Sequence, residues 1–158
     1  MSYFSRLTDI VTCNLSDLLA EAEDPAAALE EIIEEMREGV EAAQRSVMTA
    51  TATEERIRAE IEELAGQRTY WADVARQELK AGREDKARFA LMRKGEVADL
   101  IAGVEQQHAS AESTRRHLVT TLQALEARLA DAVRRRASLA TGDAPDDERT
   151  VQAAVSAH

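Results

Sequence analysis

Hydrophobic residues recur along most of the chain at alternating spacings of four and three residues. Stepping in this way from Leu29, twelve of the first fourteen positions are apolar, and Glu54 and Arg68 are the exceptions. Stepping from Ala87, twelve of sixteen positions are apolar. An average spacing of 3.5 residues sustained over this length predicts two long helices that pair along a coiled-coil seam.

Helix-breaking residues are few, and they predict where these two helices begin and end. Asp24 is a good N-cap and Pro25 suits the first helical position, while Gly82 interrupts the pattern between the two segments. A short link joins antiparallel neighbours, so the fold class is all-α, with a long antiparallel coiled-coil hairpin. We expect helices at 25–81 and 86–140, joined by a tip at 82–85. Gly95 and Gly103 weaken the second helix, and a bend is expected near them.

The opening segment, 1–22, is predicted to form a separate amphipathic helix. One half of its helical wheel is apolar, and two interpretations of this half are open. It packs on the hairpin or on a neighbouring chain, or it lies in a membrane interface and inserts these side chains. Beyond the hairpin, 141–158 is expected to be a flexible tail with room for a short helix. The apolar half holds Tyr3, Phe4, Leu7, Ile10, Val11, Leu15, Leu18 and Leu19.

Charge supports the antiparallel pairing independently of hydrophobicity. With the turn centred near Arg83, the acidic start of the first helix lies beside the basic end of the second. The same register brings Glu54 near Arg115 and Arg68 near Asp99. Exposed ion pairs contribute only about 0–1 kcal/mol each, so these charges are expected to set register more than stability. The register charges are Glu34, Glu35, Glu38, Arg134, Arg135 and Arg136.

Composition removes several classes of function. The net charge of −10 argues against a nucleic-acid binder, which needs a basic surface. The sequence holds no phosphate loop, dinucleotide motif or nucleophile elbow, and its three histidines lack partners at metal-ligand spacing. We therefore expect a non-enzyme with no cofactor and no bound metal. The chain has no stretch long enough to span a membrane, and we expect a cytoplasmic protein.

Two motifs resemble a known family. The opening Tyr3-Phe4-Ser5-Arg6-Leu7 leads to the elbow Glu23-Asp24-Pro25, and the tip reads Gly82-Arg83-Glu84-Asp85-Lys86. Both are similar to phage shock protein A and its relative, the vesicle-inducing protein in plastids, over about residues 1–140. The resemblance implies an ESCRT-III-like fold that assembles into rings or rods and binds stressed membranes through its first helix. It also implies that Phe4, Leu7, Ile10, Val11, Leu15 and Leu18 are the inserting residues. In the membrane-interface interpretation of the opening segment, Tyr3 and Phe4 lie at the headgroup boundary.

The resemblance favours one function and leaves a second open. The first is a self-assembling peripheral protein on the inner face of the cytoplasmic membrane, which binds lipid and remodels the bilayer under envelope stress. The second is a soluble coiled-coil regulator of a protein partner such as an AAA+ transcriptional activator. Members of the family continue into further helices, whereas here the seam ends near Leu139. The geometry of any polymer is therefore open.

Overall fold

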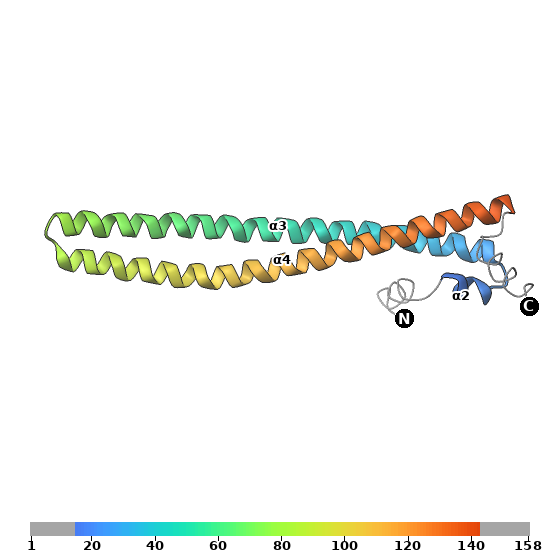
Figure 1. Cartoon of the computed structure of the whole chain (residues 1–158), viewed down its shortest axis with the longest axis horizontal. Coiled ribbons are helices and arrows are strands. Elements are labelled where there is room, and N and C mark those ends of the chain that lie inside the picture. Colours follow the sequence, from blue (N-terminus) through green and yellow to red (C-terminus); the bar gives the residue numbers. More distant parts are fainter. Residues whose placement is uncertain (1–14, 143–158) are drawn as a thin grey trace, which may run out of the picture. The chain divides into compact units, whose positions relative to one another are not determined.

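The computed structural model describes residues 15–142, and these are almost entirely helical. Helix α2 spans Leu15–Ala20, α3 spans Pro25–Lys80 and α4 spans Glu84–Thr141. Helices α3 and α4 are antiparallel and joined by a short turn (Figure 1). The predicted all-α hairpin is confirmed. The segment 1–14 and the tail 143–158 lie outside the described residues.

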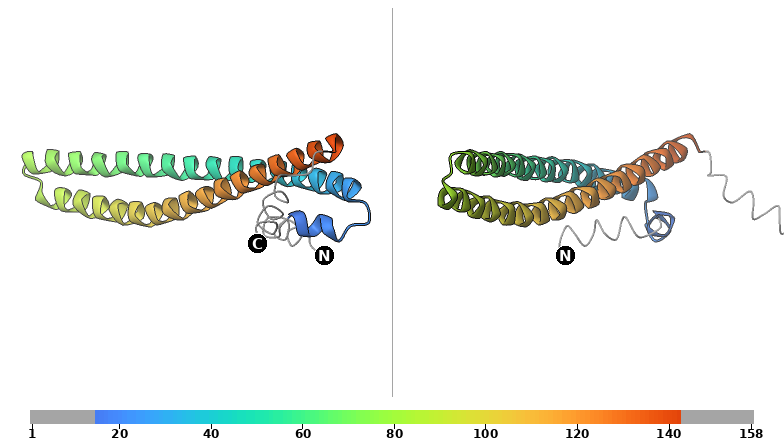
Figure 2. Two further views of the ribbon diagram at one scale, coloured as in Figure 1. Left: turned by 45° about the vertical axis from the view of Figure 1, so that its right-hand side comes forward. Right: turned by 60° about the vertical axis from the view of Figure 1, so that its left-hand side comes forward.

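The chain divides into two compact units, and α3 and α4 run through both. The base unit comprises the described residues 15–45 and 120–142, and the tip unit comprises 46–119. Figure 2 gives two further views, in which the α3 and α4 segments of the tip unit lie side by side. Each unit has its own packing and is described by itself.

The core of the base unit is built from large aliphatic side chains. Leu29 and Ile33 are fully buried and Met36 is 1% exposed, and all three pack with Ala132 of α4. Leu15 of α2 joins this cluster at 5% exposure. Around it lie partly buried residues from all three helices: Leu19, Ile32, Leu129 and Val133.

The tip unit is held by a narrower seam of small and β-branched residues. Each helix buries only one stripe of apolar residues in the seam, because the tip unit contains only the two helices. Its buried hydrophobic residues are Ile57, Ala75, Ala87, Ala90, Val97, Ile101 and Val104. Glu54 is buried among them, as the one charged residue in the buried set of the described chain.

The turn between the helices follows from the backbone freedom of one glycine. Gly82 has φ of +75°, and its N–H donates to the carbonyl of Leu79 at 3.0 Å. The Arg83 N–H donates to the carbonyl of Glu78 at 2.9 Å, which completes a Schellman motif. Helix α4 then begins at Glu84, two residues before its predicted start. Glu84 and Asp85 therefore belong to its first turn, where carboxylates suit the helix dipole.

The predicted seam positions are buried or half-buried, with two exceptions. Arg68 is exposed and forms no ion pair with Asp99 or any other described residue, so that predicted pair is wrong. Leu139 is 51% exposed, because the pairing weakens at the end of α4. Helix α4 runs without interruption through Gly95 and Gly103, where a bend was expected, and its ribbon curves along the yellow stretch of the chain (Figure 1).

Candidate functional site

The end of the opening segment contacts the base of the hairpin. Leu15 is buried in the base core, whereas Leu18 on the next turn of α2 is 39% exposed. The Arg135 Nη1 of α4 donates a hydrogen bond to Ser16 Oγ at 2.6 Å. For these residues the structure matches the first interpretation, a helix that packs its apolar side on the hairpin.

The other predicted inserting residues cannot be placed in the same way. They precede α2 in the sequence and fall outside the described residues. Their role in the membrane stays a prediction. They are Tyr3, Phe4, Leu7, Ile10 and Val11.

The elbow between α2 and α3 is a capped helix start. The Asp24 Oδ1 accepts a hydrogen bond from the Ala27 N–H at 3.2 Å, and the Asp24 carbonyl accepts one from Ala28 at 3.0 Å. Pro25 opens the helix, where its missing N–H costs nothing. The cap satisfies donors that would otherwise be free, so α3 can start at Pro25 independently of α2. Glu23 is exposed beside this cap.

The predicted register charges only partly meet across the hairpin. Arg136 Nη1 lies 3.3 Å from Glu30 Oε2, which joins the end of α4 to the start of α3. Arg134 and Arg135 instead form ion pairs with Asp131 on their own helix, at 3.4 and 3.5 Å. On α3, Glu34 pairs with Arg37 on its own helix, Glu35 is half-buried and Glu38 is exposed.

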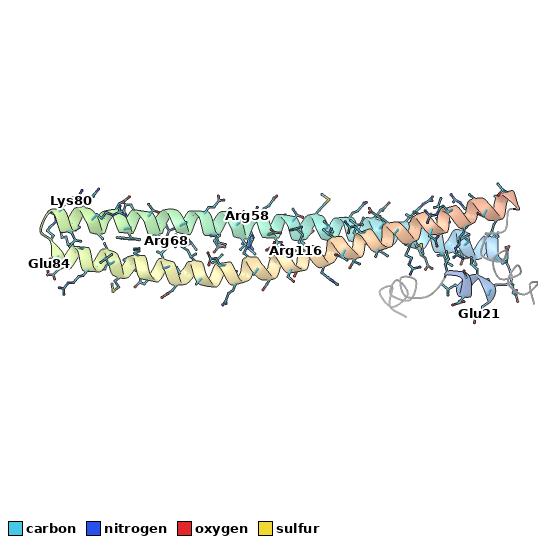
Figure 3. All side chains as sticks on the ribbon, in the orientation of Figure 1. Glu21, Arg58, Arg68, Lys80, Glu84 and Arg116 are labelled. Atoms are coloured by element: carbon cyan, nitrogen blue, oxygen red, sulfur yellow. The ribbon has the colours of Figure 1, made fainter. Side chains whose placement is uncertain are left out.

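A polar layer crosses the seam of the tip unit, as the sequence predicted. Arg115 Nε donates to Glu54 Oε2 at 2.5 Å, and Arg58 Nη2 donates to Glu54 Oε1 at 3.1 Å. The Glu54 side chain is 7% exposed, whereas that of Arg58, labelled in Figure 3, is 58% exposed. His108 Nε2 lies 3.8 Å from Glu54 Oε1 and is a buried atom with no hydrogen-bond partner among the described residues.

Within this layer, the pKa values of Glu54 and Arg115 are shifted in the directions that keep both groups charged. The hydrogen bond from Arg115 holds the pKa of Glu54 below its ordinary value of 4.5, and it outweighs the opposing effect of burial. The charges of Arg115, Arg58 and His108 act in the same direction. The same hydrogen bond raises the pKa of the Arg115 guanidinium. Glu54 is therefore held as a carboxylate in a polar layer of a mainly apolar seam.

The tip carries a second ion pair that the sequence pattern did not reveal. The Arg83 guanidinium donates to Glu78 through Nε, and through Nη2 at 3.2 Å to Glu78 Oε1. This bond lowers the pKa of Glu78 and raises that of Arg83. Lys80 and Glu84, labelled in Figure 3, mark the helix ends that flank the turn. The spacing of five residues across a helix end could have signalled the pair, since a Schellman turn brings such positions together.

Aromatic side chains cluster beside this turn. Trp71 is half-buried and makes edge-to-face contacts with Tyr70 at 5.2 Å and with Phe89 at 6.3 Å between ring centroids. Arg93 lies over the Phe89 ring, 5.7 Å from its centroid. The prediction that Trp71 belongs to the seam is confirmed in part. Its contacts across to α4 were not foreseen, because Phe89 falls outside the heptad count.

Within residues 15–142, the length and hydropathy needed to cross a bilayer are found in no helix.

Comparison with known proteins gives a consistent result. The sequence profile of the PspA/IM30 family matches residues 2–152. The membrane-associated protein Vipp1 of Synechocystis is 33% identical over 132 residues, which are 84% of this chain and 49% of that protein. The phage shock protein A homolog of Deinococcus radiodurans is 33% identical over 129 residues, 82% of this chain and 58% of that protein. The chain spans about half the length of these relatives.

Proposed function

The chain belongs to the PspA/IM30 family, and on this premise we propose that it is a non-enzymatic protein that assembles with itself and binds a membrane peripherally. Through this binding it would stabilise and remodel the cytoplasmic membrane under envelope stress. The observation that carries the proposal is the family match, which includes the amphipathic opening segment as well as the hairpin. Relatives named membrane-associated proteins support it.

The elbow gives this function a physical basis. Four residues, 21–24, separate α2 from α3, and the Asp24 cap stabilises the start of α3 whatever α2 contacts. Release of α2 would expose Leu15, and a buried leucine contributes about 1.5–3 kcal/mol relative to an exposed one. A bilayer offers the same side chain an equally apolar environment. Exchange of the hairpin for the membrane therefore costs little at Leu15 and exposes the capped hairpin base.

The opening segment would bind by apolar insertion rather than by charge. Its polar half carries Arg6, Asp9 and Asp17, so it has no basic excess. An amphipathic segment of this kind depends on the apolar area that it buries between headgroups. Binding is then expected to persist at salt concentrations that screen surface charges.

Flotation with liposomes of anionic and zwitterionic lipids tests the membrane role. The full chain should float, and Phe4→Asp/Val11→Asp should lose most of that binding, because two carboxylates enter the apolar half. Ser5→Asp/Thr12→Asp is the matched control, since it adds the same charge to the polar half and should still float. Equal flotation of the full chain and the Phe4→Asp/Val11→Asp variant would remove the role assigned to this segment.

Electron microscopy of the purified full chain tests the assembly role separately. Rings or rods would support the proposal. A discrete small oligomer at all concentrations would leave only the membrane-binding part of it.

A further inference from the structure

The side chains that hold α2 on the hairpin base are also side chains that the membrane role needs. Leu15 is 5% exposed in the core cluster of the base unit, and Leu19 packs against the same cluster. Both belong to the apolar half of the opening segment. A side chain buried in this core cannot lie in a bilayer at the same time. The docked and the membrane-bound arrangements of α2 therefore exclude each other at Leu15.

Burial of Leu15 does not by itself decide between these two arrangements. The hydrophobic effect is non-directional and depends on the apolar area that leaves water. The base core and the bilayer both remove the Leu15 side chain from water. The balance therefore depends on contacts that one arrangement makes and the other lacks.

Arg135 of α4 makes such a contact with α2. Its Nη1 donates to Ser16 Oγ at 2.6 Å, between residues 119 positions apart in the sequence. Its Nε lies 3.5 Å from Asp131 Oδ2, so a carboxylate one turn earlier on α4 orients the guanidinium. The Arg135 side chain is only 32% exposed, whereas that of its neighbour Arg134 is 74% exposed.

The bond from Arg135 to Ser16 favours the docked arrangement. When α2 leaves the base, water takes the place of each partner. The net gain of a hydrogen bond over its hydrated groups then corresponds to about three- to tenfold in the equilibrium between docked and released α2. This contribution has no counterpart when Leu15 moves from the base core to a bilayer.

We propose that Arg135 makes an autoinhibitory contact, which holds α2 on the hairpin base and so limits the binding of the opening segment to lipid. While Arg135 holds Ser16, Leu15 and Leu19 stay in the base unit. When the contact opens, both leucines become available to a membrane. The inference rests on the proposed function, and it adds a regulatory residue that lies on α4, outside the segment that binds.

Hydrogen exchange of the full chain without lipid tests the contact itself. Arg135→Met keeps an unbranched apolar side chain and removes the guanidinium. It should accelerate exchange of the α2 amides about three- to tenfold, since their exchange follows the fraction of molecules in which α2 is released. Exchange in α3 around Ile33 should not change. Equal acceleration in α3 would mean that Arg135 stabilises the whole base, and it would overturn the proposal.

Arg134→Met is the matched control for this experiment. It removes the same charge from the adjacent position and an ion pair with the same residue, Asp131, but it leaves the bond to Ser16 in place. Its α2 amides should exchange at the rate of the original chain. Acceleration as large as that of Arg135→Met would show that the lost charge, rather than the contact with Ser16, releases α2, and the proposal would fail.

Ser16→Asp tests the contact from the side of α2. It places a carboxylate beside the Arg135 guanidinium, and a pair in which both partners are charged binds more strongly. Exchange of the α2 amides should therefore slow. Most of this slowing should disappear when Ser16→Asp is combined with Arg135→Met. Slowing of equal size with and without Arg135 would contradict the proposal.

Flotation with zwitterionic liposomes, which carry no net charge, links the contact to lipid binding. Apparent affinity is proportional to the fraction of molecules in the binding-competent state. Arg135→Met should therefore bind about three- to tenfold more tightly than the original chain, and Arg134→Met should bind as the original chain does.

The same flotation series separates this inference from the proposed function. If the original chain floats and Arg135→Met floats no better, the autoinhibitory contact is overturned and the membrane role stands. If neither floats at any lipid concentration, the membrane role fails and the regulatory inference fails with it.

Discussion

The base and tip units use the same two helices but bury different amounts of hydrophobic surface. In the base unit α2 adds a third surface, and Leu29, Ile33 and Met36 reach 0–1% exposure. In the tip unit each of the two helices buries one apolar stripe, and the two residues that reach 0–1% exposure there are the small Ala87 and Ala90. Of the nine large hydrophobics exposed in the described chain, seven belong to the tip unit and only Leu18 and Leu139 to the base unit. Two helices alone cannot cover all the apolar residues that a long hairpin carries.

The largest expected difference between the two units comes from shortening one buried isoleucine to alanine in each core. Ile33→Ala in the base unit should cost about 2–5 kcal/mol of unfolding free energy, because it leaves a cavity in a closed core. Ile57→Ala in the tip unit should cost less, since Ile57 is 5% exposed and water borders its seam. Denaturant unfolding of both variants measures the difference. An equal or larger cost at Ile57 would show that the tip seam is as well packed as the base.

A second prediction concerns the polar layer of the tip unit. Glu54→Gln should lower stability at neutral pH, because the amide keeps the acceptor oxygen for Arg115 but loses the charge. The pKa of Glu54 is lower in the folded chain than its ordinary value of 4.5, so the unfolded chain binds the proton first. The contribution of Glu54 is therefore fully present above pH 4.5 and is lost as the pH falls through the folded pKa.

Thermal unfolding between about pH 3 and pH 7 measures this effect. The original chain should lose stability on acidification more steeply than Glu54→Gln does. Glu55→Gln is the control, since Glu55 is exposed on the same helix and should leave the acid dependence unchanged. Parallel curves for the original chain and Glu54→Gln would mean that the layer does not couple folding to protonation.

The smallest expected effect compares two glycines of the tip unit that differ in backbone conformation. Gly82→Ala should cost about 1–2 kcal/mol, because its φ of +75° is unfavourable for a residue with a Cβ. Gly66→Ala should stabilise the chain by up to about 1 kcal/mol, since it lies inside α3 with open space around it. The midpoints of denaturant unfolding should therefore move in opposite directions. Stabilisation by both substitutions would show that the turn tolerates a side chain.

Much of this fold could be predicted because heptad spacing depends only on local sequence. The seam from Leu29 to Ala75, the Asp24 cap and the Glu54–Arg115 contact all follow from periodicity, helix-end chemistry and one estimate of the turn centre. The Arg68–Asp99 pair failed although it came from the same arithmetic. Arg68 and Asp99 are both exposed, and an exposed ion pair gains little over two hydrated charges. A register that is correct to one residue therefore does not force these two side chains together.

The candidate site was less predictable than the hairpin. The amphipathic pattern of 1–22 fits a membrane and a protein surface equally well, so it could not foretell that Leu15 is buried in the core cluster that includes Ile33 and Met36. The contact between Trp71 and Phe89 depends on how two faces meet beside the turn, which spacing along one helix does not contain. The Glu78–Arg83 pair likewise requires the turn geometry.

The glycine turn also has a consequence for how the chain reaches its fold. Contacts beside Gly82 join residues only a few positions apart, whereas the Arg136–Glu30 contact joins residues 106 positions apart. Closing a long loop first costs more chain entropy than extending a pair that already exists. We therefore expect the contacts between α3 and α4 to form first beside the turn and then progressively towards the base. Gly82→Ala should then slow refolding, whereas Ile33→Ala should mainly accelerate unfolding.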